Sequence, residues 1–137
     1  MRHLKRFWKV KEKFDFHEII SILRTSDIIS KIEIKNIDEI KGRGIYKVRC
    51  NLIPSSYKLE MRFILTEEEI FYSYQLFTDK PIIRWDNTPH YSKIKNYPHH
   101  FHTEDGNVTE STLKGNVIED LQCVLSKIRK TLKEYEY

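Results

Sequence analysis

The sequence predicts an α+β fold: an antiparallel four- to five-stranded meander sheet packed by a short N-terminal helix and a long C-terminal helix. In the middle of the chain, apolar residues recur at every second position in runs separated by turn residues, which is typical of half-buried strands. At both ends the apolar spacing changes to three and four, which is typical of amphipathic helices. The length of 137 residues fits a single domain, 1–137.

The N-terminal helix is predicted over residues 15–26. Asp15 precedes the apolar stripe and Glu18 follows three residues later, which is the pattern of a capping box. The stripe has helical spacing and consists of Phe16, Ile19, Ile20 and Leu23. One face of this helix is therefore expected to pack against the sheet.

The strands are predicted at about 32–40, 46–52, 58–65 and 70–77, and residues 82–86 start a fifth. Short turns separate them, so neighbouring strands pair as a meander. One face is apolar and requires a cover; it includes Tyr46, Val48, Leu59, Met61, Phe63 and Ile70. The other face is mildly basic and carries Lys47, Arg49, Lys58, Glu60, Arg62, Ser73 and Gln75. We interpret it as a surface that can hold RNA, with an ordinary solvated face as the alternative.

The C-terminal helix is predicted at about 112–135 and supplies that cover. Its apolar residues recur every three or four positions: Leu113, Val117, Leu121, Val124, Ile128, Leu132 and Tyr135. The helix begins either near Thr112 or after a cap in which Asn116 and Glu119 take part.

The charge of the chain is unevenly distributed. Lys and Arg number 24 against 20 Asp and Glu, a net charge of +4, yet residues 1–13 hold six cations against Glu12 alone. This basic N-terminal arm contacts a phosphate backbone or is simply a solvated arm. With two cysteines, no apolar run of about 18 residues and no secretory signal, the protein is expected to be cytoplasmic and to make no membrane contact.

A histidine-rich segment covers residues 84–106. Four of the six histidines lie here, at His90, His99, His100 and His102. Neither a regular helix nor a regular strand accounts for this composition, so we expect a shaped loop, and such loops often carry sites.

Imidazoles beside a guanidinium suggest RNA cleavage without a metal. One histidine takes the proton of the 2′-hydroxyl and a second, protonated, gives a proton to the leaving 5′-oxygen. Arg84 would stabilise the charge on the phosphate, while Asp86 orients a histidine or holds Arg84. The candidate catalytic residues are Arg84, Asp86, His90, His99, His100 and His102. The candidate RNA contacts are Lys47, Arg49, Lys58, Arg62, Trp85, Asn87 and Tyr91; Trp85 either stacks on a base or anchors the loop in the core.

Other functions fit the same residues. The histidines together with Asp86, Glu104 and Asp105 could bind Zn²⁺ or Mn²⁺ in a metal-dependent phosphodiesterase or nucleotide-transfer enzyme. Their spacing matches no compact metal motif, so no metal site and no cofactor is assigned. A non-catalytic RNA-binding module, or a structural or interaction protein whose imidazoles bond loop carbonyls, are the remaining alternatives.

The segment also resembles a known family. Its order is Arg84-Trp85-Asp86-Asn87, then Pro89-His90, then Pro98-His99-His100 and His102. This order is similar to the signature of the TumE family, small toxins of type II toxin–antitoxin systems in bacteria and archaea. The motif lies in 84–102 and the similar layout covers about 15–135; Tyr91 stands where the family often has a second histidine.

The resemblance implies a growth-inhibiting toxin that a cognate antitoxin protein holds in check, with RNA as its target. We expect the antitoxin to cover the basic face or the histidine loop, because blocking the site is the simplest inhibition. The edge strand at 32–40 could pair across a homodimer.

Overall fold

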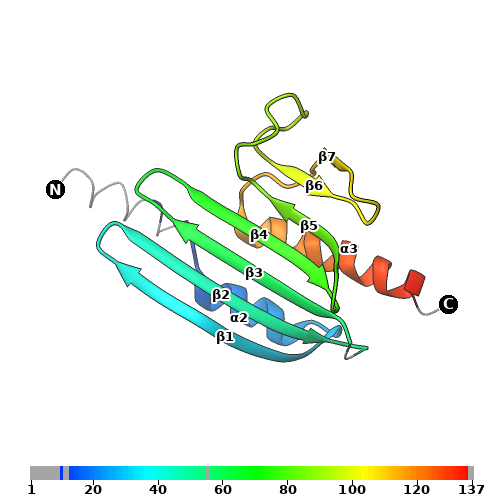
Figure 1. Cartoon of the computed structure of the whole chain (residues 1–137). Coiled ribbons are helices and arrows are strands. Elements are labelled where there is room, and N and C mark those ends of the chain that lie inside the picture. The colour runs from blue at the N-terminus through cyan, green and yellow to red at the C-terminus, as the bar shows by residue number, and fades with distance from the viewer. Residues whose placement is uncertain (1–9, 11–12, 55, 136–137) are drawn as a thin grey trace.

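The computed structural model describes residue 10, residues 13–54 and residues 56–135, and within them it has two helices and one antiparallel sheet (Figure 1). In chain order the elements are α2 (Phe16–Thr25), β1 (Ile29–Ile40), β2 (Arg43–Leu52), β3 (Lys58–Leu65), β4 (Ile70–Phe77), β5 (Pro81–Asp86), β6 (His100–His102), β7 (Val108–Glu110) and α3 (Val117–Tyr135). Each strand pairs with the next along the chain, so the sheet is a meander as predicted. The basic arm at 1–13 lies almost wholly outside the described residues.

The sheet has seven strands, so the prediction of four to five was wrong. The two extra strands, β6 and β7, have three residues each, which is too short to show an alternating pattern in sequence. The prediction of a loop over 84–106 was wrong in part: its first residues belong to the predicted fifth strand, which is β5, and β6 within it is too short to show a pattern in sequence. Arg84–Asp86 end β5, His100–His102 form β6, and the loop proper is 87–99.

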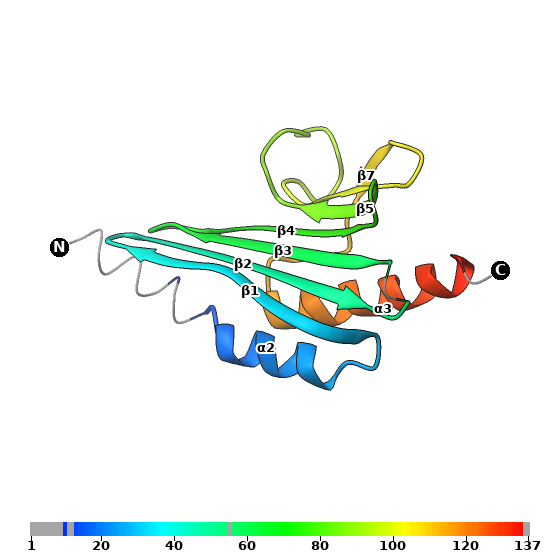
Figure 2. The same cartoon turned by 60° about the horizontal axis from the view of Figure 1, so that its bottom comes forward.

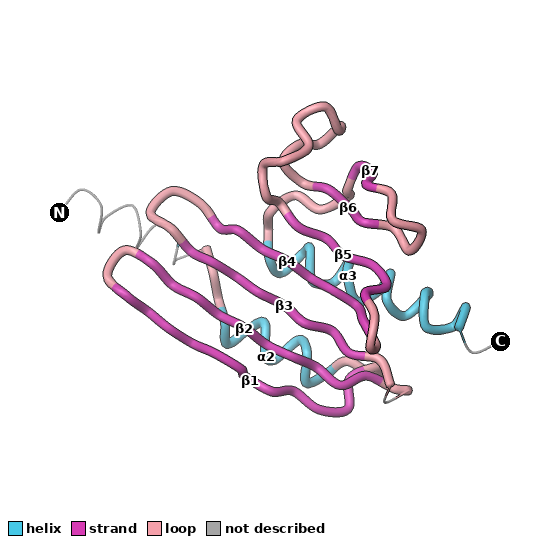
Figure 3. Tube along the Cα trace, in the orientation of Figure 1, coloured by secondary structure: helices cyan, strands magenta, loops and turns pink. Residues whose placement is uncertain are grey.

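Both helices cover one face of the sheet and leave the other face open (Figures 2 and 3). The core lies between the helices and the inward side chains of the strands, which alternate between buried and exposed along β2, β3 and β4. Loop 87–99 rises on the open side, away from the helices. The open face and this loop are therefore the parts of the fold that can meet a large ligand.

Helix α2 forms where its capping pattern predicted it. The Asp15 carboxylate accepts a hydrogen bond from the Glu18 N–H at 3.0 Å, and the helix ends where the Ser26 N–H donates to the Leu23 carbonyl. Ile19 and Leu23 are fully buried against the sheet. Burying each of these side chains contributes about 1.5–3 kcal/mol, which fixes the helix on this face.

Helix α3 begins at Val117, because Asn116 is its cap and accepts the Glu119 N–H at 3.2 Å. The alternative start near Thr112 was wrong. Gly115 has φ +94°, which is incompatible with a helix. The buried carboxylate of Asp120 accepts the N–H groups of Lys114 and Gly115 at 3.0 and 2.8 Å, and burial raises its pKa.

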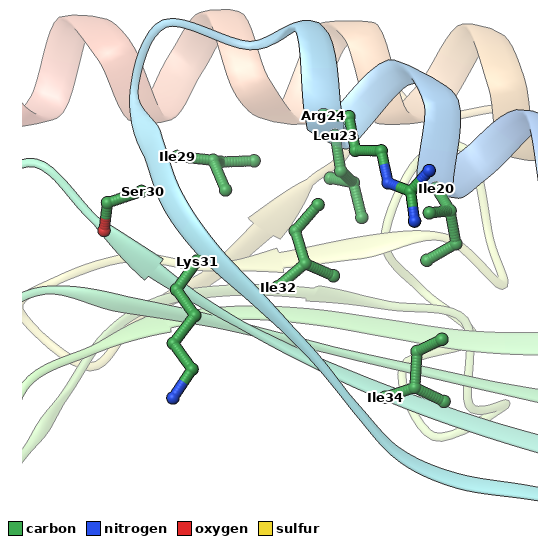
Figure 4. A pocket seen from close by; sticks show the side chains of 8 residues that line it. All are labelled: Ile20, Leu23, Arg24, Ile29, Ser30, Lys31, Ile32 and Ile34. Carbon is green, nitrogen blue, oxygen red and sulfur yellow. The ribbon is translucent and has the colours of Figure 1, made fainter.

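The β1 edge of the sheet is long and partly apolar. Ile34, Ile37 and Ile40 are 51%, 48% and 58% exposed. A groove of about 350 Å³ lies between β1 and α2, and Arg24 lines it together with apolar side chains such as Ile20, Leu23 and Ile32 (Figure 4). Because four strands lie between β1 and β6, this groove is separate from the histidine-rich end of the sheet. That β1 pairs across a homodimer stays a prediction.

Neither α2 nor α3, the helices of the described chain, combines the length and the apolar character that a membrane span requires.

Candidate active site

The register between β5 and β6 brings four of the predicted site residues together. Arg84 lies opposite His102, and Asp86 lies opposite His100. Because side chains alternate along a strand, all four point to the open face, whereas Trp85 and its partner Phe101 point to the core. The short strand β6, which the sequence pattern did not reveal, thus assembles the site.

Asp86 is the centre of the cluster. Its Oδ1 lies 2.6 Å from Nε2 of His100, and its Oδ2 lies 2.9 Å from Nε of Arg84 and 3.4 Å from Nε2 of His102. Oδ1 also accepts hydrogen bonds from the backbone N–H and the hydroxyl of Thr88. The carboxylate is only 2% exposed, so its partners hold it in a fixed position.

The charge state of Asp86 follows from these contacts. Burial by itself would raise its pKa, but hydrogen bonds from Thr88 and the positive charges of His100 and Arg84 outweigh burial. The pKa of Asp86 therefore lies below its ordinary value. An ionised carboxylate can orient imidazoles and compensate their charge.

His100 is a buried, fully engaged imidazole. It is 1% exposed, its Nε2 faces the Asp86 carboxylate, and its Nδ1 lies 3.1 Å from the Pro98 carbonyl. Carboxylate and carbonyl oxygens only accept hydrogen bonds, so both contacts are satisfied when both ring nitrogens carry a proton. In that form His100 and Asp86 make a buried ion pair.

His102 is the accessible imidazole of the cluster. Its side chain is 31% exposed. Desolvation lowers its pKa, the charges of His100 and Arg84 lower it further, and Asp86 opposes them. A neutral imidazole near pH 7 can accept a proton from a substrate. Arg84, 43% exposed and held by Asp86, presents a cation on the same face.

Loop 87–99 places an aromatic ring beside the two imidazoles. Tyr91 meets His100 edge-to-face at 4.8 Å and His102 at 6.1 Å between ring centroids, while the Tyr91 ring itself stays 37% exposed. His90 is exposed, and its ring lies 6.5 Å from that of Tyr91. Both residues therefore remain candidates for contacts with a bound substrate.

Two asparagines anchor this loop. Asn87 joins its start to β4, because its side chain accepts the Tyr72 N–H and donates to the Ile70 carbonyl, both at 2.8 Å. Asn96 has φ +69°, and its Nδ2 donates to the carbonyls of Ser111 and Leu113 at 2.7 and 2.8 Å. Sequence reasoning did not identify Asn96 or Thr88. An asparagine just before Tyr97-Pro98 was the available signal, since asparagine tolerates positive φ better than most residues.

His99 points away from the cluster. Its Nδ1 lies 2.7 Å from the Tyr72 hydroxyl, its ring stacks on the Tyr72 ring, and Gly115 packs beside it. Burial lowers the pKa of His99. The predicted catalytic histidines are thus divided: His100 and His102 lie on the open face, whereas His99 faces the layer of α3.

Two predicted RNA contacts are unavailable on the surface. Trp85 is 4% exposed and packs on Phe101 with 5.0 Å between ring centroids, so it anchors the core and cannot stack on a base. Asn87 is 7% exposed, and both ends of its amide are used within the sheet. Each faces inward because of its position in the fold, and neither prediction of an RNA contact is supported.

The basic face continues directly from the cluster. One cross-strand row runs from Arg49 through Glu60 and Gln75 to Arg84, and the adjacent row runs from Lys47 through Arg62 and Ser73 to Asp86. Glu60, which interrupts the basic surface, is held by Lys47 and Arg49, each at 3.2 Å. Lys58 and Arg62 also lie on this face, so the site forms one end of a cationic surface.

Asp86, His100 and His102 also form a potential metal ligand set, with one ligand atom from each within 4.8 Å of the others. Two imidazoles and a carboxylate suit Zn²⁺, Mn²⁺ or Fe²⁺. Two contacts fit a metal poorly: the His100–Asp86 distance of 2.6 Å leaves no space for an ion between them, and Arg84 places a positive charge on the same carboxylate. A bound ion would have to separate the Asp86 carboxylate from Arg84 and from its present contact with His100.

Comparison with known proteins gives one result. A family model described as Toxin TumE matches residues 19–133, which includes every residue of the cluster. No curated protein and no solved structure matches the chain. The match confirms the family resemblance, and its span agrees with the extent of about 15–135 predicted from the sequence.

Proposed function

The chain belongs to the TumE toxin family, and from that premise we propose that it is the toxin of a type II toxin–antitoxin system and acts as a metal-independent ribonuclease. The observation that carries the proposal is the arrangement of His102 and Arg84 around the buried carboxylate of Asp86. These groups lie at the end of a cationic sheet face, where a phosphodiester backbone can approach them.

His102 is the proposed general base. Its Nε2 faces Asp86, which leaves Nδ1 to take the proton of a 2′-hydroxyl. The freed 2′-oxygen attacks the adjacent phosphorus, the bond from phosphorus to the 5′-oxygen breaks, and the products are a 2′,3′-cyclic phosphate and a 5′-hydroxyl. Arg84 stabilises the negative charge that builds up on the phosphate.

We assign the acid to His90, which gives a proton to the departing 5′-oxygen. His90 is exposed on the loop whose next residue, Tyr91, contacts His102. His100 and Asp86 are positioning residues: both are buried, and they hold Arg84 and His102 in place. His99 has no role in the reaction under this proposal, because it bonds Tyr72 on the helix side.

The proposed partner is a cognate antitoxin protein that covers the open face or loop 87–99. Such a cover would exclude RNA from Arg84 and His102 without any change in the toxin itself. An antitoxin surface with exposed carboxylates would complement Lys47, Arg62 and their neighbours on this face.

The test is RNA cleavage by the purified protein in the presence of EDTA. We expect products with 2′,3′-cyclic phosphate ends, loss of cleavage by at least a hundredfold in His102→Ala, and unchanged cleavage in His17→Ala. His17 is an exposed histidine on α2 and serves as the matched control. If His102→Ala arrests growth as well as the original chain does, the protein is a non-catalytic RNA-binding module.

A metal-dependent phosphodiesterase or nucleotide-transfer enzyme is the second candidate, because Asp86, His100 and His102 can converge on one ion. It predicts that EDTA abolishes activity, that Zn²⁺ or Mn²⁺ restores it, and that elemental analysis finds the metal in the purified protein. RNA cleavage that resists EDTA would exclude it.

A further inference from the structure

The open face carries an apolar row next to the site. Ile45, Ile64 and Phe71 are direct cross-strand neighbours on β2, β3 and β4. Ile64 is 41% exposed, Ile45 and Phe71 are partly exposed, and none of the three belongs to the hydrophobic core. Contiguous apolar side chains that remain in contact with solvent are typical of a binding surface.

This row lies directly beside the row that leads to Asp86. Phe71 and Ser73 are two residues apart on β4, about 7 Å along the strand, and Ser73 pairs with Asp86 on β5. The Phe71 backbone is therefore about 8 Å from that of Asp86 by strand geometry. An aromatic ring at this place can contact the nucleotide next to a phosphate held at Arg84.

The charges around the row indicate what it binds. Lys47 and Arg62 flank it in the adjacent row, and Arg84 follows at the site. Glu60 and Asp86, the carboxylates nearest the site, are held by cations, whereas the exposed Asp38 lies beside Ile45 at the β1 end of the row. Apolar surface bordered by cationic side chains, among them the exposed Arg62, is complementary to a ligand with flat apolar bases and a phosphate backbone.

We propose that Phe71, supported by Ile64, stacks a nucleobase beside the cleaved phosphodiester, so that the substrate is single-stranded RNA. The inference rests on the proposed ribonuclease function. In a duplex the faces of the bases are stacked on one another, and only an unpaired strand can place a base on the ring. Tyr91, on the loop beside His102, offers a second ring for the base on the other side of the phosphate.

Phe77 is an aromatic residue of the same face whose ring is not free to stack on a nucleobase. The guanidinium of Arg49 lies over its ring at 5.6 Å from the centroid, so that ring face is already occupied. The proposal therefore concerns Phe71 specifically, and substitutions at the two positions should differ.

The experiment measures binding of a 12-nucleotide RNA that is 2′-O-methylated throughout, so that it cannot be cleaved, as a single strand and as a duplex. We expect Phe71→Ala to weaken binding of the single strand on the order of tenfold and to leave duplex binding unchanged. Phe71→Leu, which keeps an apolar side chain, should fold and lose part of the affinity. Ile37→Ala, an exposed isoleucine on β1, is the matched control and should change neither.

Equal losses for single strand and duplex, or no loss in Phe71→Ala and Phe71→Leu, would overturn the inference. So would variants that lose antitoxin binding while RNA binding stays intact, because the row would then be a protein contact. If cleavage depends on His102 but Phe71→Ala does not change RNA binding, base stacking on Phe71 is rejected and the proposed ribonuclease function is kept. Phe71-dependent binding without any cleavage supports the single-strand preference and rejects the ribonuclease.

Discussion

The carboxylate of Asp86 and Nε2 of His100 lie 2.6 Å apart, and both side chains are almost completely buried. This pair joins the end of β5 to the start of β6 on the open face of the sheet. The same carboxylate bonds Arg84 and Thr88, so it couples the stability of the sheet edge to the geometry of the site.

Asp86→Asn should therefore damage both stability and function. The substitution leaves the buried His100 without its counter-charge, and removing one partner of a buried ion pair costs about 3 kcal/mol. Chemical denaturation should show this loss of unfolding free energy, and the folded fraction should have lost RNA cleavage. Asp38→Asn, at an exposed position on β1, is the control and should be neutral. An unchanged denaturation midpoint in Asp86→Asn would contradict the buried pair.

The dependence of cleavage on pH tests His102. Burial lowers the pKa of His102 below its ordinary 6.5, and only the neutral imidazole can act as a base. Cleavage should therefore fall at pH below that ordinary value, as the folded protein protonates His102, and it should fall again at high pH, where the general acid has lost its proton. The lowered pKa of His102 also affects the free energy of unfolding. As pH falls, the unfolded chain protonates this histidine before the folded protein does. The stability of the folded protein is therefore highest above pH 6.5 and decreases as pH falls through the pKa of His102 in the folded state. A flat profile of kcat/KM between about pH 5 and 8 would exclude a catalytic imidazole.

Substitution of His99 separates the two adjacent histidines. His99 bonds the Tyr72 hydroxyl on the helix side, so His99→Ala should lose about 1 kcal/mol of stability while cleavage stays within a few fold of the original rate. Tyr72→Phe removes the same hydrogen bond and should have the same effect. If His99→Ala abolishes cleavage in a folded protein, His99 has a role in the reaction that its position does not explain.

Strand alternation explains how much of this arrangement the sequence could predict. The sheet face with Lys47, Arg49 and Arg62 followed from period-two spacing and is present. The same rule applied to β5 would have placed Trp85 on the core side and Asp86 on the open side, because Trp85 is two residues after the apolar Ile83 and points to the same face. Strand alternation also explains why His99 and His100 point to opposite faces of the sheet. This could not be predicted, because β6 has only three residues and shows no periodic pattern in sequence.

Contacts between distant segments could not be predicted at all. Asn96 bonds the carbonyls of Ser111 and Leu113, and Asp120 bonds the N–H groups of Lys114 and Gly115. Each of these contacts depends on where loop 87–99, β7 and α3 meet in space. A local sequence pattern contains no information on how these distant segments are arranged in space. Only the fold shows that Asn96 holds the loop in place.

Asn96→Ala tests that anchoring. It removes two hydrogen bonds to the carbonyls of Ser111 and Leu113, whose residues are buried, and such unsatisfied groups cost about 1–3 kcal/mol. The loop should then open more often, so trypsin should cut at the exposed Lys93 and Lys95 several times faster. Cleavage of RNA should fall as Tyr91 leaves the imidazoles, while helix content by circular dichroism stays constant. Asn36→Ala on β1 is the control, and equal trypsin rates in both variants would show that Asn96 does not hold the loop.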